Sequence, residues 1–131
     1  MKPINQPHED ATARGRQLRK EIFGADGVKS HDTADDFQMP LQDMVTRICF
    51  GEVWSRPTLP LKLRSMLTIA ILAGQSRPDQ LKNHIKGAIY NGVSKEEIRE
   101  ILLHAMLYVG IPAGSDSWRQ ATAALKEIGA Y

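Results

Sequence analysis

Apolar residues recur along most of the chain at the three- and four-residue spacings of an α-helix. These spacings predict a basic amphipathic helix over about residues 8–23 and a second helix over about 38–50, with a loop rich in Gly, Asp and Ser between them. In the second helix the repeating apolar residues are Leu41, Met44, Val45 and Ile48. Nowhere do apolar and polar residues alternate as they do in a half-buried strand.

A third helix is predicted over residues 61–74, after a break at Gly51, Pro57 and Pro60. Its apolar residues point in almost every direction around the helix axis. They are Leu61, Leu63, Met66, Leu67, Ile69, Ala70, Ile71 and Leu72. A helix that is apolar on all sides is buried on all sides. In a chain of 131 residues, we expect part of that burial to come from another subunit.

Two further helices are predicted to form a central helical hairpin. Ser76 begins one and Ser94 the other, each with an acidic residue three positions later, as in a capping box. Gly92, between them, can adopt the left-handed conformation that ends a helix. A last helix is expected over about residues 112–128. The pattern therefore predicts an all-α bundle of about six helices.

Length and composition indicate one soluble domain spanning residues 1–131, with about residues 1–7 frayed. The net charge of +2 is too small and too dispersed to suggest a nucleic-acid or membrane partner. Cys49 is the only cysteine, which excludes an internal disulfide and a Cys-x-x-Cys redox pair. The chain has no secretory signal and no apolar run that could span a bilayer, so a cytoplasmic location is expected.

His84 lies among the apolar positions of the fourth predicted helix, whose stripe is Leu81, Ile85, Ala88 and Ile89. An imidazole on that face must be hydrogen-bonded or functional, because an unpaired buried polar group costs about 1–3 kcal/mol. The sequence leaves two interpretations of His84 open: a hydrogen-bonded core histidine and a group that transfers a proton.

Several cationic and aromatic residues are further candidates. Arg77 precedes a proline at a helix start, and a cation beside a helix N-terminus suits a carboxylate. Arg64, early in the third helix, either reaches solvent by its long stem or is paired inside the fold. The segment GEVWSRP lies on a break between helices and is either a functional loop or a connector that its tryptophan anchors. Its candidates are Glu52, Trp54 and Arg56.

Four segments in combination resemble the carboxymuconolactone decarboxylase family. They are GEVWSRP, LKLRSMLTIAIL, HIKGAIYNGVSKEEIREILLH and GIPA. The resemblance runs from about residue 37 to 128 and is strongest to the 4-carboxymuconolactone decarboxylases. It implies an all-helical fold shared with the alkyl hydroperoxidase D proteins. It also implies a homo-oligomer, a trimer or a hexamer, in which the strongly apolar helices form subunit interfaces.

The resemblance also places the possible catalytic positions. Peroxidase members of the superfamily carry Cys-x-x-Cys followed by a histidine, and this chain has Arg77, Gln80 and His84 at those three positions. A chain without either thiol cannot run a dithiol peroxidase cycle. The decarboxylase branch often reads RPHELRLH where this chain reads RPDQLKNH, so Asp79 and Gln80 replace a histidine and a glutamate.

The activity implied by the resemblance is decarboxylation of 4-carboxymuconolactone to 3-oxoadipate enol-lactone in the protocatechuate (β-ketoadipate) branch of aromatic catabolism. The lactone ring is its own electron sink, so neither a cofactor nor a metal is expected. On this interpretation His84 donates the proton, assisted by Glu52 and Arg77 as the other catalytic residues. The substrate-binding residues would be Arg56, Arg64, Gln80 and Trp54.

Two alternatives stay open at this stage. One is a family member that acts on a different lactone or carboxylic acid. The other is a non-catalytic helical assembly that keeps the fold and only binds a ligand. In each case the expected partners are a small carboxylate and further copies of the same chain.

Overall fold

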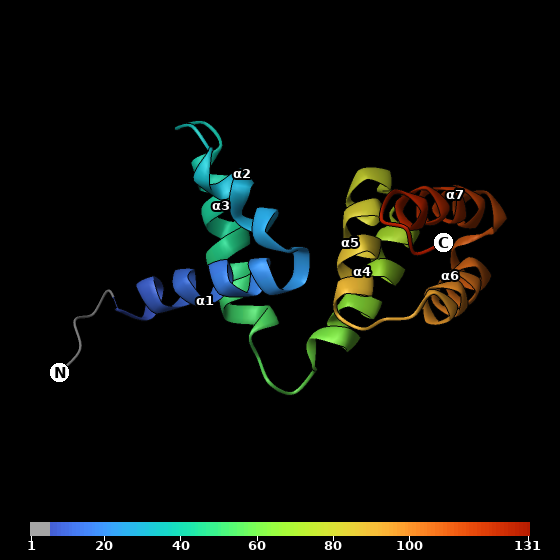
Figure 1. Ribbon diagram of the computed structural model, residues 1–131, viewed down its shortest axis with the longest axis horizontal. Coiled ribbons are helices and arrows are strands. Elements are labelled where there is room, and N and C mark those ends of the chain that lie inside the picture. Colours follow the sequence, from blue (N-terminus) through green and yellow to red (C-terminus); the bar gives the residue numbers. More distant parts are fainter. Residues whose placement is uncertain (1–5) are drawn as a thin grey trace. The chain divides into compact units, whose positions relative to one another are not determined.

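The computed structural model describes residues 6–131, with side chains from Asp10 onwards, and its elements are all helical (Figure 1). The chain is divided into two compact units, one ending at Leu59 and the other spanning Pro60–Tyr131. The prediction of an all-α fold is confirmed, and the described residues contain no strand. Of the residues expected to be frayed, Gln6 and Pro7 lie in a helix, and residues 1–5 lie outside the described part. No helix in the described part is both long and apolar enough to cross a membrane.

The first unit is built on two long helical segments that cross each other. Its elements are α1 (Gln6–Phe23), η1 (Ala25–Val28), α2 (Lys29–Asp32), α3 (Met39–Asp43) and η2 (Met44–Trp54). The predicted loop before residue 38 thus contains two short helical turns. η2 continues α3 directly as a π-helix, so the two form one helical segment.

The predicted break at Gly51 is wrong, because the helix continues through it to Trp54. Gly51 is buried where η2 crosses α1, and a Cβ atom there would lie 2.0 Å from the carbonyl oxygen of Ala11. A Cβ atom on Gly15 of α1 would lie 1.7 Å from the carbonyl oxygen of Thr46. Both glycines therefore permit close backbone contact between the helices, which is a different use of glycine from breaking a helix.

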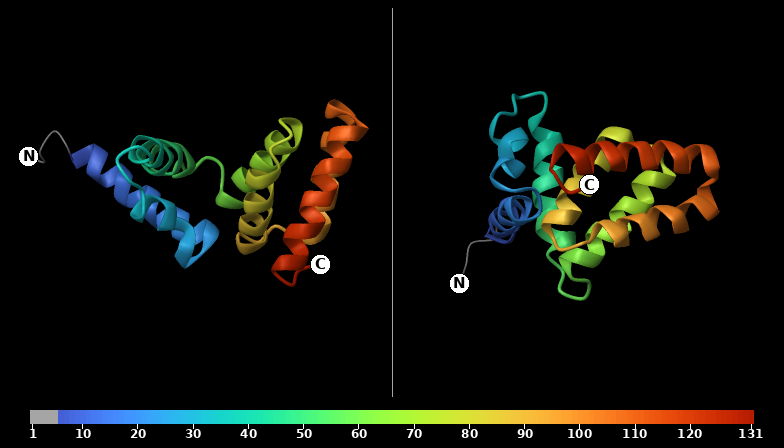
Figure 2. Two further views of the ribbon diagram at one scale, coloured as in Figure 1. Left: turned by 90° about the horizontal axis from the view of Figure 1, so that it is seen from above. Right: turned by 45° about the vertical axis from the view of Figure 1, so that its right-hand side comes forward.

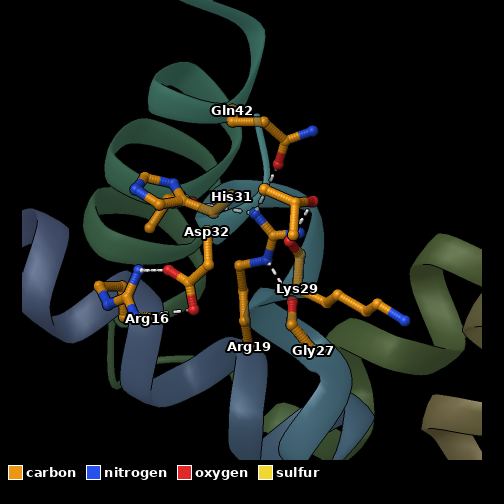
Figure 3. A network of polar contacts seen from close by, with 9 residues as sticks. Arg16, Arg19, Gly27, Lys29, His31, Asp32 and Gln42 are labelled. Atoms are coloured by element: carbon orange, nitrogen blue, oxygen red, sulfur yellow. Dashed lines mark hydrogen bonds and ion pairs between the residues drawn. The ribbon is translucent and has the colours of Figure 1, made fainter. Parts of the chain in front are cut away.

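A buried arginine joins the elements of this unit (Figure 3). Arg19 is only 8% exposed, and burial lowers its pKa below the ordinary value for arginine. Its Nε donates to the carbonyl oxygen of Gly27 at 2.7 Å, and its Nη1 donates to Gln42 Oε1 at 3.0 Å and Thr46 Oγ1 at 2.9 Å. The guanidinium thus links α1 to η1, α3 and η2 through neutral oxygen atoms.

A second contact of the same network is at the surface. Arg16 binds Asp32 at 2.6 Å and holds the pKa of that carboxyl below its usual value. Nδ1 of His31 lies 2.9 Å from Thr46 Oγ1, the hydroxyl that Arg19 also contacts. These contacts fix α2, in the segment expected to be a loop, against α1 and η2.

The second unit contains four helices, shown from two directions in Figure 2. They are α4 (Leu61–Gly74), α5 (Pro78–Tyr90), α6 (Lys95–Val109) and α7 (Ile111–Glu127). α5 and α6 each pack against both α4 and α7. The core between them is apolar and includes Ile69, Leu81, Ile85, Ile98, Leu102, Ala121 and Leu125.

Of the predicted helix ends, those at the turn between α5 and α6 are confirmed and the one before α5 is wrong. Gly92 has φ +87°, and Ser94 and Glu97 form a reciprocal capping box with both hydrogen bonds at 3.0 Å. The predicted cap at Ser76 is wrong, because the N-cap residue of α5 is Arg77 and no side chain caps this end. Ser76 adopts φ +53°, a left-handed conformation that turns the chain before the helix.

The strongly apolar helices are not buried on all sides within the chain. On α4, Leu63, Leu67 and Ile71 are 43–58% exposed. A second exposed apolar set, on α6 and the start of α7, consists of Leu103, Leu107, Tyr108 and Ile111. The expected homo-oligomer, whose interfaces would cover these faces, stays a prediction.

Candidate functional site

The candidate residues are divided between the two units. Glu52, Trp54 and Arg56 belong to the first unit, at the end of η2 and just after it. Trp54 is buried and its ring centroid lies 5.3 Å from that of Phe50, so it anchors this end of η2 to the core. Glu52 and Arg56 are exposed. The remaining candidates, Arg64, Arg77, Gln80 and His84, belong to the second unit.

The central candidate, His84, lies in the middle of α5, which packs against both α4 and α7. Near the end of α5, Asn91 Nδ2 donates to Ser65 Oγ in the early part of α4 at 3.4 Å. Before the start of α5, the backbone N–H of Arg77 donates to the carbonyl oxygen of Leu72 near the end of α4 at 3.2 Å. The two contacts show that α4 and α5 run antiparallel, with His84 between the two ends of α5.

His84 is largely buried, and its Nδ1 atom is shielded from solvent. Burial lowers the pKa of its imidazole from the ordinary 6.5 to about 4, because the charged form loses its hydration. His84 is therefore neutral at pH 7 in the protein without ligand. A neutral imidazole carries one N–H donor and one acceptor nitrogen, so it can both give and take a hydrogen bond.

Arg64 and Gln80 lie on different helices of the second unit. Arg64 is half-buried in the first turn of α4, and Gln80 is exposed in the first turn of α5. The amide of Gln80 can orient a ligand by hydrogen bonds but cannot transfer a proton at neutral pH.

Arg77 lines a cavity of about 280 Å³ between the start of α5 and residues 116–120 of α7. The other arginine of this cavity is Arg119, and His84 is not among the lining residues. The structure thus brings Arg77 together with a residue that the sequence did not single out. On the sequence, Arg119 is one of several charged residues on the polar face of an amphipathic helix, and its spacing to Arg77 carries no signal.

Thiol chemistry and metal binding are the other possibilities to consider in the described part of the chain. Cys49 is half-buried, and burial raises the pKa of its thiol, which favours the unreactive protonated form. No group of three or more His, Cys, Asp or Glu side chains among the described residues could hold a metal ion.

Comparison with known proteins gives consistent matches. The model of the "Carboxymuconolactone decarboxylase family" matches residues 40–127, which include parts of both units. A 4-carboxymuconolactone decarboxylase of Acinetobacter baylyi is 38% identical over 122 residues, covering 92% of this chain and 91% of the relative. A nitrosuccinic acid decarboxylase of Metarhizium robertsii is 39% identical over 107 residues, covering 81% of this chain and 75% of the relative.

Proposed function

Since the chain belongs to the carboxymuconolactone decarboxylase family, we propose that it converts 4-carboxymuconolactone to 3-oxoadipate enol-lactone and carbon dioxide without a cofactor. The observation that carries this proposal is the 38% identity to a 4-carboxymuconolactone decarboxylase over 92% of the chain. The reaction would belong to the catabolism of aromatic compounds through protocatechuate.

The substrate itself supplies the electron sink for this reaction. When the bond to the leaving carboxylate breaks, its electron pair moves through the ring double bond to the lactone carbonyl and forms a dienolate. Carbon dioxide leaves, and a proton added to ring carbon gives the enol-lactone. The protein must hold the second carboxylate, stabilise the enolate oxygen and supply the proton.

We assign the proton transfer to His84, which can act in two steps. The neutral ring offers an N–H to the developing enolate oxygen, and one such donor lowers a barrier by about 3–4 kcal/mol. A bound dicarboxylate raises the pKa of His84, because nearby negative charge favours the imidazolium. The imidazolium can then protonate the ring carbon.

The other candidates of the second unit suit the same substrate. Arg77 and Arg64 can pair with its carboxylates, since a guanidinium meets a carboxylate with two parallel hydrogen bonds. Gln80 would hydrogen-bond to its oxygen atoms. The roles of Glu52, Trp54 and Arg56, which belong to the first unit, stay predictions from the family resemblance.

The test is direct. The purified protein is incubated with 4-carboxymuconolactone without added cofactor, and carbon dioxide and the enol-lactone are measured. We expect turnover by the wild type and a loss of at least about a hundredfold in kcat for His84→Ala. Full turnover by His84→Ala would remove the proposed proton donor. Tight binding of a dicarboxylate without carbon dioxide release would favour a non-catalytic assembly.

The match to a nitrosuccinic acid decarboxylase supports a second candidate, decarboxylation of another dicarboxylic acid. A nitro group, like a lactone carbonyl, can accept the electron pair left by carbon dioxide, so the demands on the protein are similar. Carbon dioxide release from nitrosuccinate but not from 4-carboxymuconolactone in the same assay would select this candidate.

A further inference from the structure

Helices α5 and α7 run parallel to each other (Figure 2, left), and residues of both line the cavity. In the middle of α5, Lys82 and Lys86 both bind the carboxylate of Glu127 at the end of α7. Nearer the start of α5, Arg77 and Leu81 line the cavity together with Arg119 and Gln120 of α7. The two helices are thus joined by ion pairs beyond a cavity that is lined by cations.

The charges of this cavity do not balance. Its lining contains two cations, Arg77 and Arg119, and one anion, Asp116. Asp116 pairs with Arg119 at 3.1 Å, and Arg77 makes no ion pair with any residue in the described part of the chain. The lining residues therefore carry a formal charge of +1 in total, and the one carboxylate in the first turn of α5, Asp79, is exposed and not among them. The N-terminus of α5 adds partial positive charge at the same place.

The lining also offers hydrogen-bonding groups of the kind that bind a carboxylate. A guanidinium has five N–H donors, and the contact of Arg119 with Asp116 uses one nitrogen, Nη1. The amide of Gln120 adds a donor and an acceptor, and Leu81 supplies an apolar wall. The volume of about 280 Å³ is near the lower end for ligand pockets, which suits a small organic acid rather than a nucleotide or a peptide.

We propose that this cavity binds a carboxylate of a small dicarboxylic acid, held jointly by Arg77 and Arg119. The assignment of that acid as the substrate rests on the proposed function. The carboxylate held here is the one that stays on the product, because pairing with guanidinium groups stabilises the charge that decarboxylation must remove. Arg119 is thereby a further substrate-binding residue.

The first experiment measures binding of succinate by calorimetry at low ionic strength. The variants are Arg77→Gln, Arg119→Gln and, as a matched control, Arg99→Gln. Arg99 is an exposed arginine of the same unit that lines a different cavity, between α6 and α7. We expect Kd to rise about tenfold in each of the first two variants, since each loses a charge-assisted hydrogen-bonding group, and to stay within about twofold in the control.

The second experiment uses only the wild type, so its outcome does not depend on whether the variants fold. Succinate added to the isotopically labelled wild type should shift the backbone amide resonances of residues 76–81 and 116–120. Neutral succinamide should shift none of them. Four results would each overturn the site. Two concern calorimetry: Arg77→Gln and Arg119→Gln bind succinate as tightly as the wild type, or Arg99→Gln weakens binding as much as they do. The other two concern ligands and resonances: succinamide binds as tightly as succinate, or succinate shifts only the resonances of other residues.

Turnover separates this inference from the proposed function. If the wild type converts 4-carboxymuconolactone, Arg77→Gln and Arg119→Gln should raise KM about tenfold, and an unchanged KM would overturn the site while the decarboxylase stands. If the wild type converts no lactone but succinate binding still depends on both arginines, the carboxylate site stands and the proposed function fails.

Discussion

The lowered pKa of His84 makes the stability of the protein depend on pH in a way that a variant of this one residue can test. Its pKa is about 4 in the folded protein against 6.5 when exposed, so below pH 6.5 the unfolded chain binds a proton that the folded chain does not. The stabilising effect of a neutral His84 is complete above pH 6.5 and is lost as the pH falls to 4. We expect this loss to reach about 3 kcal/mol, at 1.36 kcal/mol for each pH unit.

The measurement compares wild type and His84→Gln by chemical denaturation between pH 7.5 and 4. Glutamine is polar but does not titrate, so the variant should lose less stability across this range than the wild type. Parallel pH profiles of the two proteins would show that His84 keeps an ordinary pKa.

Arg19 gives a second prediction at this scale. Its planar guanidinium reaches Gly27, Gln42 and Thr46 at once, which a lysine ammonium on a flexible stem cannot reproduce. We expect Arg19→Lys to lower the free energy of unfolding by about 2–3 kcal/mol, as buried oxygen atoms lose their donors. The control Arg99→Lys, on an exposed side chain, should change it by less than about 0.5 kcal/mol. Equal small effects would show that the network does not contribute to stability.

At the scale of the elements, the close crossing of α1 and η2 requires glycine at the contact. A methyl group on Gly51 would overlap the backbone of α1, and neither helix can move aside without losing its packing. We expect Gly51→Ala to destabilise the protein by about 3 kcal/mol or more, measured by thermal and chemical denaturation.

The matched control for this prediction is Gly74→Ala at the end of α4. A Cβ atom there would meet only a side-chain methyl of Val109, at 3.2 Å. Alanine is the better helix former, so the control should stay within about 1 kcal/mol of the wild type. Similar losses in both variants would mean that the close crossing is not what requires glycine at position 51.

At the scale of the whole molecule, two exposed apolar faces need an explanation. The faces on α4 and on α6 with the start of α7 contain seven large side chains that an isolated chain leaves in contact with water. Faces of this kind are typical of protein interfaces. We expect the protein to be a trimer or hexamer in solution, as the family resemblance also implies.

Light scattering after size-exclusion chromatography tests this expectation. Leu67→Glu and Leu107→Glu place a charge on each face and should shift the protein towards smaller species, because burying an unpaired charge is costly. Arg99→Glu, a charge change on another exposed part of α6, should leave the mass unchanged. A wild type that is monomeric at all concentrations would contradict the prediction.

Local sequence predicted the long helices and the turn between α5 and α6, because helical periodicity, the Ser94 capping box and Gly92 are features that tertiary packing did not override. It missed η1 and α2, which contacts with α1 and η2 hold in place. It also indicated the family, because the matching segments keep their order along the chain. Tertiary structure decided the matters that depend on residues far apart in sequence. The packing of α1 on η2 decided that Gly51 continues a helix, and burial decided that His84 is neutral. The parallel packing of α5 and α7 brought Arg119 to Arg77 across 42 positions, a proximity that no local pattern encodes because it is set by packing between helices.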